Sequence, residues 1–328
     1  MIKVTIILPV FNTENYIKRC LDSILSQSYN YWDLIVVDDG STDSSGIICD
    51  KYAQTDTRIK VIHKINEGAS SARKLGIKSS KGEFLFFIDS DDYIDPNTLE
   101  ELLSPLKESN QDIIIGNINI VRNNRIYCNE QQLISGNNKI SLISSLLSIL
   151  VISSLCGRLI RKNLFDDIVM LDQLKIGEDS IIMYQLFAKT EKVWLINNRL
   201  YYYVQHAESA MHSKSKDLVK SHIDYCKWVI SFVEKSFPEC EDALLRNSIA
   251  YFVINEYFAF LRDGGQPNFD PIFSSKVNNY YFNNKIAKSK MPRWRKGLLE
   301  LYRINPIIGN IYRYIFVKLR YISDKHLR

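Results

Sequence analysis

Short runs of apolar, β-branched residues alternate with helical patterns over the first 121 residues, and this alternation constrains the fold more than any other feature of the sequence. The predicted strands are 4–10, 33–39, 59–63, 83–89 and 112–121. Helical patterns occupy 14–27, 43–55, 68–79 and 96–108. Strands that alternate with helices in this way are typical of a parallel sheet covered on both faces. The sequence therefore predicts an α/β fold with a Rossmann-like, mostly parallel sheet flanked by helices.

Residues with good N-cap chemistry stand before several of these helical patterns. Asn12 precedes the first, Ser41 or Thr42 the second, and Asp95 comes before Pro96 at the fourth. Such side chains accept hydrogen bonds from the free backbone N–H groups of a helix start. We expect them to cap these three helices.

The pattern changes after residue 121. Between about 125 and 205 it is mixed, with strands predicted at 192–196 and 199–204 and a helix that starts near Gly177. From 217 onward it is helical, with helices predicted at 217–236, 240–263, 292–303 and 307–322. We expect a first domain, 1–215, and a helical C-terminal region, 216–328.

Residues 140–157 form an 18-residue stretch without a charged side chain, which is the length of a short membrane span. Four serines recur at the helical spacing i, i+3, i+4 and i+7, namely Ser141, Ser144, Ser145 and Ser148. Leucine and isoleucine occupy the other side. The period indicates an amphipathic helix rather than a membrane span.

Basic residues are concentrated near the C-terminus. Residues 281–328 hold 12 Lys and Arg against Glu300 and Asp324, which leaves 30 basic and 35 acidic residues in 1–280. The segment 312–328 interleaves aromatic and aliphatic residues with cations, like a basic helix on an anionic membrane. An ordinary solvated helix is the alternative. No recognition motif accompanies the charge, so we expect no nucleic-acid partner.

Cysteine usage and the N-terminus both bear on location. The six cysteines contain no C-x-x-C pair, which favours a reducing compartment. The N-terminal apolar run is too short for a signal peptide and is predicted to be the first strand. We expect a cytoplasmic protein that is peripheral to the inner face of the cell membrane.

Acidic residues gather at the end of the predicted strand 83–89. Asp89 and Asp91 are two positions apart, so their side chains point to the same face, with Asp92 beside them. Carboxylates placed together in this way suit Mg²⁺ or Mn²⁺ shared with a diphosphate. The alternative is that Asp91, Asp92 and Asp95 only cap the helix after Pro96.

A second acidic cluster follows the predicted strand 33–39. Asp38 and Asp39 can accept hydrogen bonds from a base and a ribose, while Gly40 permits close backbone approach. Ligands of such sheets bind beyond the carboxyl ends of the strands. Two acidic strand ends in one sheet are therefore better explained by a ligand than by two separate turns.

Five segments together resemble family 2 of the inverting glycosyltransferases, which have the GT-A fold. They are ILPVFNTENYIKRCLDSILSQSY (7–29), VVDDGSTDSS (36–45), NEGASSARKLGI (66–77), GEFLFFIDSDDYI (82–94) and GEDSIIMYQLF (177–187). The resemblance covers about residues 2–205. It implies a catalytic domain over 1–215, with a nucleotide-binding half, 1–121, and an acceptor-side half, 122–215.

The resemblance implies a nucleoside diphosphate sugar, usually a UDP-sugar, as donor. Pro9, Asp38 and Asp39 would hold the base. Asp89 and Asp91 would be the DxD pair, the first near the ribose and the second on the Mn²⁺ or Mg²⁺ ion.

The resemblance further implies that Asp179, of the pair Glu178 and Asp179, is the catalytic base. A carboxylate that takes the proton of the acceptor hydroxyl is what a single displacement at the anomeric carbon requires. A helix start favours the ionised form, whereas burial raises the pKa. The alternative is that both acidic residues merely cap a helix.

Three cations are further candidates. Arg73 lies on the helix after the third strand, where it would reach the diphosphate or brace the metal site. Arg158 stands where the family more often has an aromatic-Asn-Lys pattern. His206 follows the strand 199–204, at a position where related enzymes often have a charged or imidazole group near the phosphates. His63 and His212 are interpreted as structural or solvated.

The expected acceptor is a saccharide or a polyprenyl-linked saccharide in surface polysaccharide assembly, with the tail on an anionic membrane. Two alternatives stay open. A nucleotidyltransferase shares the sheet and the metal-diphosphate chemistry, but PVFNTEN after the first strand lacks its Gly-rich basic loop. A non-catalytic nucleotide-sugar or glycan binding protein is the other, against which stand Asp89, Asp91 and Asp179 together.

Overall fold

A computed structural model of the chain describes residues 1–123, 125–136, 138–171, 174, 176–206 and 216–238, with 244–246, 248–249, 252–253 and 255–256. The predicted helices 292–303 and 307–322, the basic segment 312–328 and His212 lie outside the described residues. The predicted helix 240–263 is described only in short helical stretches.

The chain divides into two compact units. One comprises Met1–Ser213 with Trp228–Pro238, and the other comprises Lys214–Lys227 with Glu239–Arg328. Helix α7 (Lys216–Ser236), predicted as 217–236, contributes residues to both. The division at residue 215 stays a prediction.

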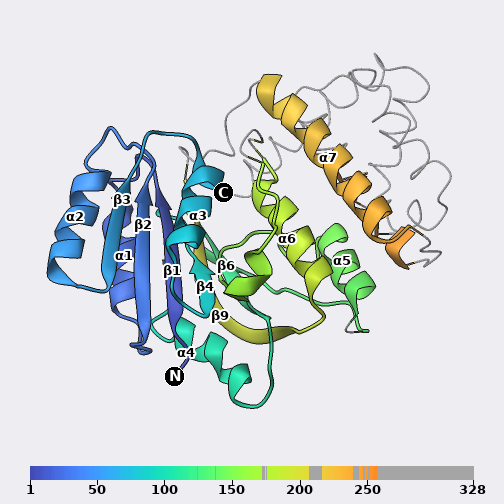
Figure 1. The fold of residues 1–328 in the computed structure, drawn as a ribbon, viewed down its shortest axis with the longest axis horizontal. Coiled ribbons are helices and arrows are strands. Elements are labelled where there is room, and N and C mark those ends of the chain that lie inside the picture. Colours follow the sequence, from blue (N-terminus) through green and yellow to red (C-terminus); the bar gives the residue numbers. More distant parts are fainter. Residues whose placement is uncertain are drawn as a thin grey trace. The chain divides into compact units, whose positions relative to one another are not determined.

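Strands and helices alternate along the first half of the first unit (Figure 1). The elements are β1 (Val4–Val10), α1 (Ile17–Leu25), β2 (Trp32–Asp38), α2 (Ser45–Thr55), β3 (Ile59–His63), α3 (Ala69–Ser79), β4 (Phe84–Phe87), β5 (Tyr93–Ile94), α4 (Thr98–Leu103) and the 3-10 helix η1 (Ser104–Lys107). The α/β prediction is confirmed, with element ends displaced by up to three residues and helix 96–108 divided between α4 and η1.

The second half adds strands on the other side of β4. Its elements are β6 (Ile113–Arg122), β7 (Arg125–Asn129), α5 (Lys139–Leu147), β8 (Arg158–Arg161), the 3-10 helix η2 (Lys162–Phe165), α6 (Glu178–Lys189) and β9 (Val193–Gln205). The two strands predicted at 192–196 and 199–204 are one continuous strand, β9, whose pairing with β6 shifts register near Asn117.

The described strands form one nine-stranded sheet in the order β3-β2-β1-β4-β8-β6-β9-β5, with β7 paired to β6. The pairs among β3, β2, β1 and β4 are parallel, whereas β8 is antiparallel to both of its neighbours. Chain order reverses beside β1, because β2 and β3 lie on one side and β4 on the other. Ligands of open α/β sheets bind at such a switch point, beyond the carboxyl ends of the strands.

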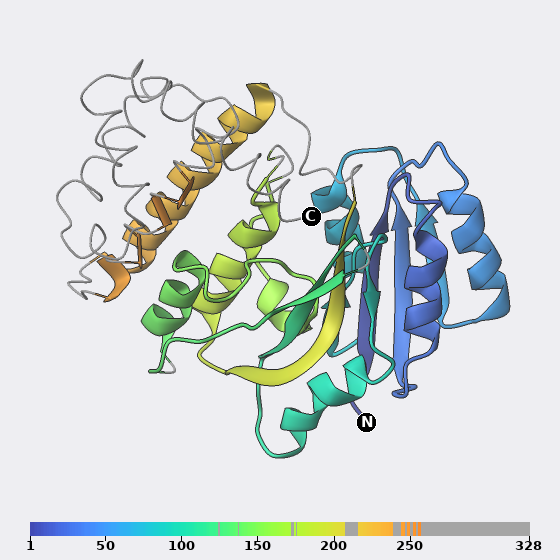
Figure 2. The same cartoon turned by 180° about the vertical axis from the view of Figure 1, so that it is seen from behind.

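Helices cover both faces of the parallel part of the sheet. Helix α3 lies over β1 and β2 on the face seen in Figure 1, and α1 lies on the face seen in Figure 2. The interior face of α3 packs Ala72 against Ile35 and Val37. Strands β1 and β4 are buried along their whole length. Strands that are buried on both faces appear in a sequence as continuous apolar runs, and these runs located β1 and β4 well.

The cap predictions at the first, second and fourth helices are wrong. Tyr16, Ser44 and Asn97 occupy the N-cap positions of α1, α2 and α4, without a side-chain cap bond. Asn12 instead accepts a hydrogen bond from the backbone N–H of Thr42, and the Ser41 hydroxyl accepts one from the backbone of Asn12. Asp95 accepts from the N–H of Asn97 rather than capping α4.

The cross-links between Asn12 and the segment after β2 hold the two loops together. These polar residues therefore shape the carboxyl edge of the sheet instead of starting helices.

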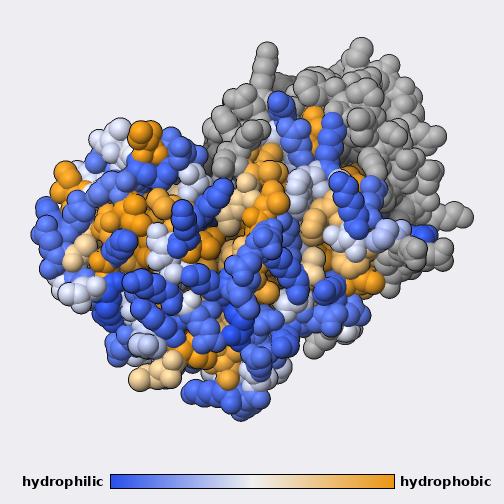
Figure 3. All heavy atoms as spheres, viewed as in Figure 1, coloured by the Kyte–Doolittle hydropathy of each residue, from blue (hydrophilic) through white to orange (hydrophobic). Residues whose placement is uncertain are grey.

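The prediction of an amphipathic helix within 140–157 is also wrong, because three of the four serines expected to face solvent are buried. Helix α5 ends at Leu147, and Ser141, Ser144 and Ser145 are buried along with its leucines. Ser145 donates to the carbonyl of Ser141 and accepts from the N–H of Ile134, so its hydroxyl is satisfied inside the protein. None of the described helices is long and apolar enough to cross a membrane. Hydrophilic and hydrophobic residues are intermingled on the face in Figure 3.

Gly82 lies against the backbone of β1, and replacing it with Ala is expected to lower the free energy of unfolding by about 1–3 kcal/mol. The added methyl group would lie 2.4 Å from the backbone nitrogen of Thr5, which cannot move without disturbing the sheet. Denaturant unfolding followed by circular dichroism measures the change. Gly116→Ala is the control, because its nearest contact would be an ordinary 3.4 Å. Equal losses in the two variants would contradict this account.

Candidate active site

The carboxyl ends of β1, β2 and β4 meet at one edge of the sheet. Pro9 pairs in register with Val37, and the N–H of Asp39 donates to the carbonyl of Val10. On the other side of β1, the N–H of Ile88 donates to the carbonyl of Ile7. The backbone thus brings Pro9 and the two acidic strand ends to the same edge, as predicted from the sequence.

Asp38 is turned inward and has partners on both carboxylate oxygens. Its Oδ1 accepts from the N–H of Ser41 at 3.0 Å, and its Oδ2 lies 2.8 Å from Nδ1 of His63. Nε2 of His63 lies 3.1 Å from Asp50 Oδ1. A side chain at Gly46 would collide with Asp38 at 2.7 Å. His63 is therefore a structural bridge between two acidic residues, which agrees with its interpretation from the sequence.

Asp39 joins the segment after β2 to the segment after β3. Oδ1 accepts from Lys64 Nζ at 2.7 Å and from the N–H of Glu67 at 3.1 Å, and Oδ2 accepts from the N–H of Gly68 at 2.7 Å. The side chain is 4% exposed. Asp39 thereby fixes the backbone that leads into α3.

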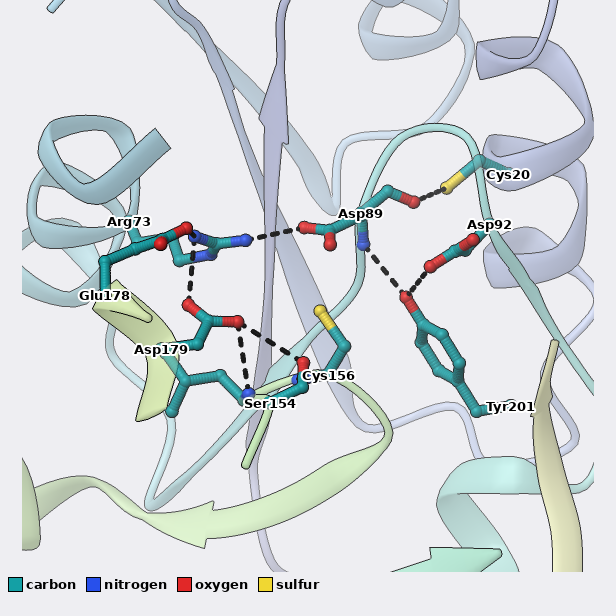
Figure 4. A network of polar contacts seen from close by, with 10 residues as sticks. Cys20, Arg73, Asp89, Asp92, Ser154, Cys156, Glu178, Asp179 and Tyr201 are labelled. Atoms are coloured by element: carbon teal, nitrogen blue, oxygen red, sulfur yellow. Dashed lines mark hydrogen bonds and ion pairs between the residues drawn. The ribbon is translucent and has the colours of Figure 1, made fainter. Parts of the chain in front are cut away.

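The turn after β4 directs its three carboxylates to different partners. Asp89 pairs with Arg73 at 2.8 Å, and Asp91 Oδ2 lies 2.9 Å from Nε2 of His206. Asp92 is 1% exposed and accepts from Tyr201 Oη at 2.5 Å and from the N–H of Val204. Asp89 and Asp91 thus stay partly open to solvent. Asp92 instead attaches the turn to β9 through Tyr201 (Figure 4).

Burial and crowding raise the pKa values of two of these carboxylates, Asp91 and Asp92. Burial raises the pKa of Asp91, and the neighbouring charge of Asp89 raises it further. Burial likewise raises the pKa of Asp92 well above its usual range, with added repulsion from Asp91. The capping alternative for Asp91 and Asp92 is wrong, since neither carboxylate bonds to α4.

Asp179 lies in the first turn of α6 and faces Asp89 across Arg73 (Figure 4). Its Oδ1 is 3.0 Å from Arg73 Nη1, and its Oδ2 accepts from the hydroxyl of Ser154 and the N–H of Leu155 at 3.3 Å each. The N-cap of α6 is Gly177, at φ 77°, so the capping alternative is wrong for this carboxylate too.

Burial has the largest effect on Asp179 and raises its pKa, while Arg73 acts in the opposite direction. The balance that the sequence left open is therefore decided by burial.

The remaining candidate cations differ in their surroundings. His206 stacks on Tyr16, with ring centroids 4.4 Å apart, and meets Asp91. Arg158 is fully buried and donates to the carbonyl of Ile152, and burial lowers its pKa to about 10.

Several contacts of this site were not foreseen. Tyr201 donates to Asp92 and accepts from the N–H of Asp89, and Ser154 donates to Asp179. These pairings join distant segments, so no local pattern marks them. Lys64 could have been found, because it directly follows β3 at the same edge of the sheet.

The bridge through His63 predicts a pH dependence of stability. Hydrogen bonding to Asp38 raises the pKa of His63 above the value near 6.5 of an unfolded chain. The resulting stabilisation is complete below that unfolded value and is lost as the pH rises through the folded value. The thermal midpoint of the wild type is expected to fall more between pH 6 and 8.5 than that of His63→Gln. Parallel curves for the two proteins would contradict the bridge.

A doubly wound sheet with acidic residues at its carboxyl edge, and a further carboxylate facing them from a separate helix, is the arrangement that the resemblance to the GT-A class of sugar transferases implies. Comparison with known protein families and solved structures agrees with this assignment. The model of glycosyl transferase family 2 matches residues 5–169, half of the chain, and the chain belongs to this family.

Two relatives come from Streptococcus pneumoniae. Glycosyltransferase GlyA is 34% identical over 61% of this chain, which spans 30% of that relative. Glycosyltransferase GlyG is 28% identical over 72% of this chain and 80% of its own length.

A solved structure has the same fold. The crystal structure of residues 1–349 of Staphylococcus aureus TarS in complex with UDP-GlcNAc superposes with a TM-score of 0.67 at 23% identity, over 94% of this chain and 89% of that one. The predicted GT-A fold is therefore confirmed.

Proposed function

We propose that the protein is an inverting glycosyltransferase that moves a sugar from a UDP-sugar to a saccharide or lipid-linked saccharide in surface polysaccharide assembly. The observation that carries the proposal is the ion-pair chain from Asp89 through Arg73 to Asp179, which sets a buried carboxylate opposite the acidic strand end. One group of carboxylates would hold the donor and the other would act on the acceptor.

The nucleoside would be held beside Pro9, Asp38 and Asp39. A carboxylate offers about four acceptor positions. Asp39 uses three of them within the protein and Asp38 uses two, so each retains capacity for a base or ribose donor. The UDP-GlcNAc complex of TarS, a structure with the same fold, supports a uridine donor.

A divalent cation fits the turn after β4. Burial raises the pKa of Asp91 and of Asp92, and the charges of neighbouring carboxylates raise both pKa values further, which is repulsion that a cation would offset. In the described residues no three His, Cys, Asp or Glu side chains are grouped as a complete metal site. Mg²⁺ and Mn²⁺ complexes with nucleotides take one or two protein carboxylates and complete their shell with phosphate oxygens and water.

We propose that Asp91, with Asp89 beside it, would hold Mn²⁺ or Mg²⁺ together with the donor diphosphate. The cation would offset charge on the departing diphosphate.

Asp179 would be the base. Its carboxylate takes the proton of the acceptor hydroxyl while that oxygen attacks the anomeric carbon, and the bond to the diphosphate breaks in the same displacement. One displacement inverts the configuration at that carbon. The raised pKa of Asp179 makes it a stronger base than an exposed aspartate.

The acceptor and the cellular location rest on relatives and on the tail. The TarS relative is a poly(ribitol-phosphate) β-N-acetylglucosaminyltransferase, which supports a surface polymer or its precursor as acceptor. The basic segment 312–328 would bring the catalytic domain to an anionic membrane on the cytoplasmic side, near a polyprenyl-linked acceptor.

A panel of nucleotide sugars incubated with the protein and Mn²⁺ tests the function. Release of UDP from one donor, stimulated by an acceptor extract, is the expected result. Release of pyrophosphate instead would favour a nucleotidyltransferase. Donor binding without turnover in any extract would favour a binding protein.

A further inference from the structure

Arg73 is a buried cation that contacts acidic side chains from two separate elements. It is 4% exposed and lies in α3, between the turn after β4 and the start of α6. One terminal nitrogen, Nη2, meets Asp89 at 2.8 Å. The other, Nη1, meets Asp179 at 3.0 Å and Glu178 at 3.7 Å. The guanidinium therefore spans the donor-side carboxylate and the carboxylate assigned as base.

The two terminal nitrogens are the parts of the guanidinium that make these contacts. Nη2 donates a hydrogen bond to Asp89, whereas Nη1 forms an ion pair with Asp179 without hydrogen-bond geometry. Among the described residues, Nε and Nη1 of Arg73 and Oδ1 of Asp179 are buried without a hydrogen-bond partner. A planar guanidinium holds two carboxylates at a fixed separation, which a flexible ammonium does not. The position of Arg73 is set by helix α3, which packs closely on β1. At Gly76, one turn after Arg73, an added methyl group would lie 2.6 Å from Cγ2 of Ile7.

We propose that Arg73 is a positioning residue that aligns Asp179 for proton abstraction and couples it to the donor-side carboxylate Asp89. This inference rests on the proposed function. Arg73 itself does not need to touch the acceptor. Its effect passes through Asp179, whose carboxylate has Ser154 and Leu155 as its other partners.

The charges around Asp179 set the direction of the effect. Burial raises the pKa of Asp179, Arg73 lowers it, and Asp89 raises it, with smaller lowering by the N–H of Leu155 and the hydroxyl of Ser154. Glu178 adds a second acidic group on α6, while the buried Arg158 and Cys156 lie near enough to interact with Asp179. Because Arg73 is the largest lowering influence, its removal leaves more of the base protonated at neutral pH.

The test compares Arg73→Met and Arg73→Lys with the wild type, measuring kcat at a saturating concentration of the UDP-sugar that the donor panel identifies, the pH profile of kcat, and UDP affinity by calorimetry. Arg73→Met is expected to lower kcat about 100-fold, since a misplacement near 1 Å has effects of that size. The acidic limb of its profile is expected to move to higher pH. Arg73→Lys is expected to recover part of both changes, because it keeps the charge but not the two-armed geometry.

Arg161→Met is the matched control. Arg161 also joins two acidic residues, Glu83 at 2.6 Å and Asp112 at 2.9 Å, away from the site. It is expected to lose stability without a change in the pH profile.

Weaker UDP binding by Arg73→Met with an unchanged kcat and an unchanged acidic limb would overturn the inference alone. A wild type without turnover would overturn the proposed function and this inference with it. If Arg73→Met does not fold, Arg73→Lys decides, and an acidic limb identical to that of the wild type would overturn the proposal.

Discussion

Replacement of Asp179 by Asn is expected to lower kcat by about 1,000-fold while the affinity for the nucleotide-sugar donor changes little. General base catalysis contributes about 10²–10⁴-fold, and an amide of the same shape cannot accept the proton. The two donors to Oδ2, Ser154 and Leu155, can still bond to the amide oxygen, so the local structure is expected to persist. Steady-state kinetics and calorimetric titration with the donor measure the two quantities.

Glu178→Gln is the matched control for this variant. Glu178 is the preceding residue on α6, lies farther from Arg73 at 3.7 Å, and its side chain is 25% exposed. It is expected to lose far less activity than Asp179→Asn. The reverse order would assign the base to Glu178, and a fully active Asp179→Asn would remove the carboxylate base from the account.

Asp91→Asn is expected to lose the stimulation by Mn²⁺ and at least about 100-fold of the turnover. A bound metal contributes several kcal/mol to charge stabilisation in the transition state, and each 1.36 kcal/mol is a factor of ten in rate. Asp91 is the suitable carboxylate because its side chain is 22% exposed and its partner is His206. Titration of Mn²⁺ into the protein with UDP, followed by electron paramagnetic resonance, gives a readout independent of turnover.

Asp92→Asn separates the roles of these neighbouring carboxylates. Asp92 is buried and bonded to Tyr201 and to the backbone of Val204, so its replacement is expected to lower the thermal midpoint but to preserve Mn²⁺ binding in the folded protein. If Asp92→Asn abolished Mn²⁺ binding and Asp91→Asn did not, the assignment within the turn would be wrong.

The apolar runs in the sequence predicted the strands of the sheet well, and the reason is physical. Strands β1 and β4 are buried on both faces, so their apolar runs are uninterrupted and stop where the polar edge begins. The carboxyl ends of parallel strands share one edge. The position of Asp38 and Asp39 at the same edge as Asp89 and Asp91 therefore follows from the parallel direction of their strands.

The contacts between side chains could not be predicted in the same way. The cap predictions for Asn12 and Ser41 failed because each side chain bonds to the backbone of the other residue's loop instead of to a helix start. The prediction that the serines of α5 face water failed because a hydroxyl can be satisfied inside a protein, as that of Ser145 is by backbone groups. The links from Arg73 to Asp179 and from Tyr201 to Asp92 join segments more than 100 residues apart, where local patterns carry no information.

The anomeric configuration of the first product tests the central claim most directly, which is a single displacement with Asp179 as base. With water as a slow acceptor, proton NMR can follow the sugar released from an α-linked UDP-sugar before it mutarotates. The account predicts that the β-anomer forms first, in the wild type at a rate at least about 100-fold above that of Asp179→Asn. Initial release of the α-anomer, or equal rates in the two proteins, would contradict it.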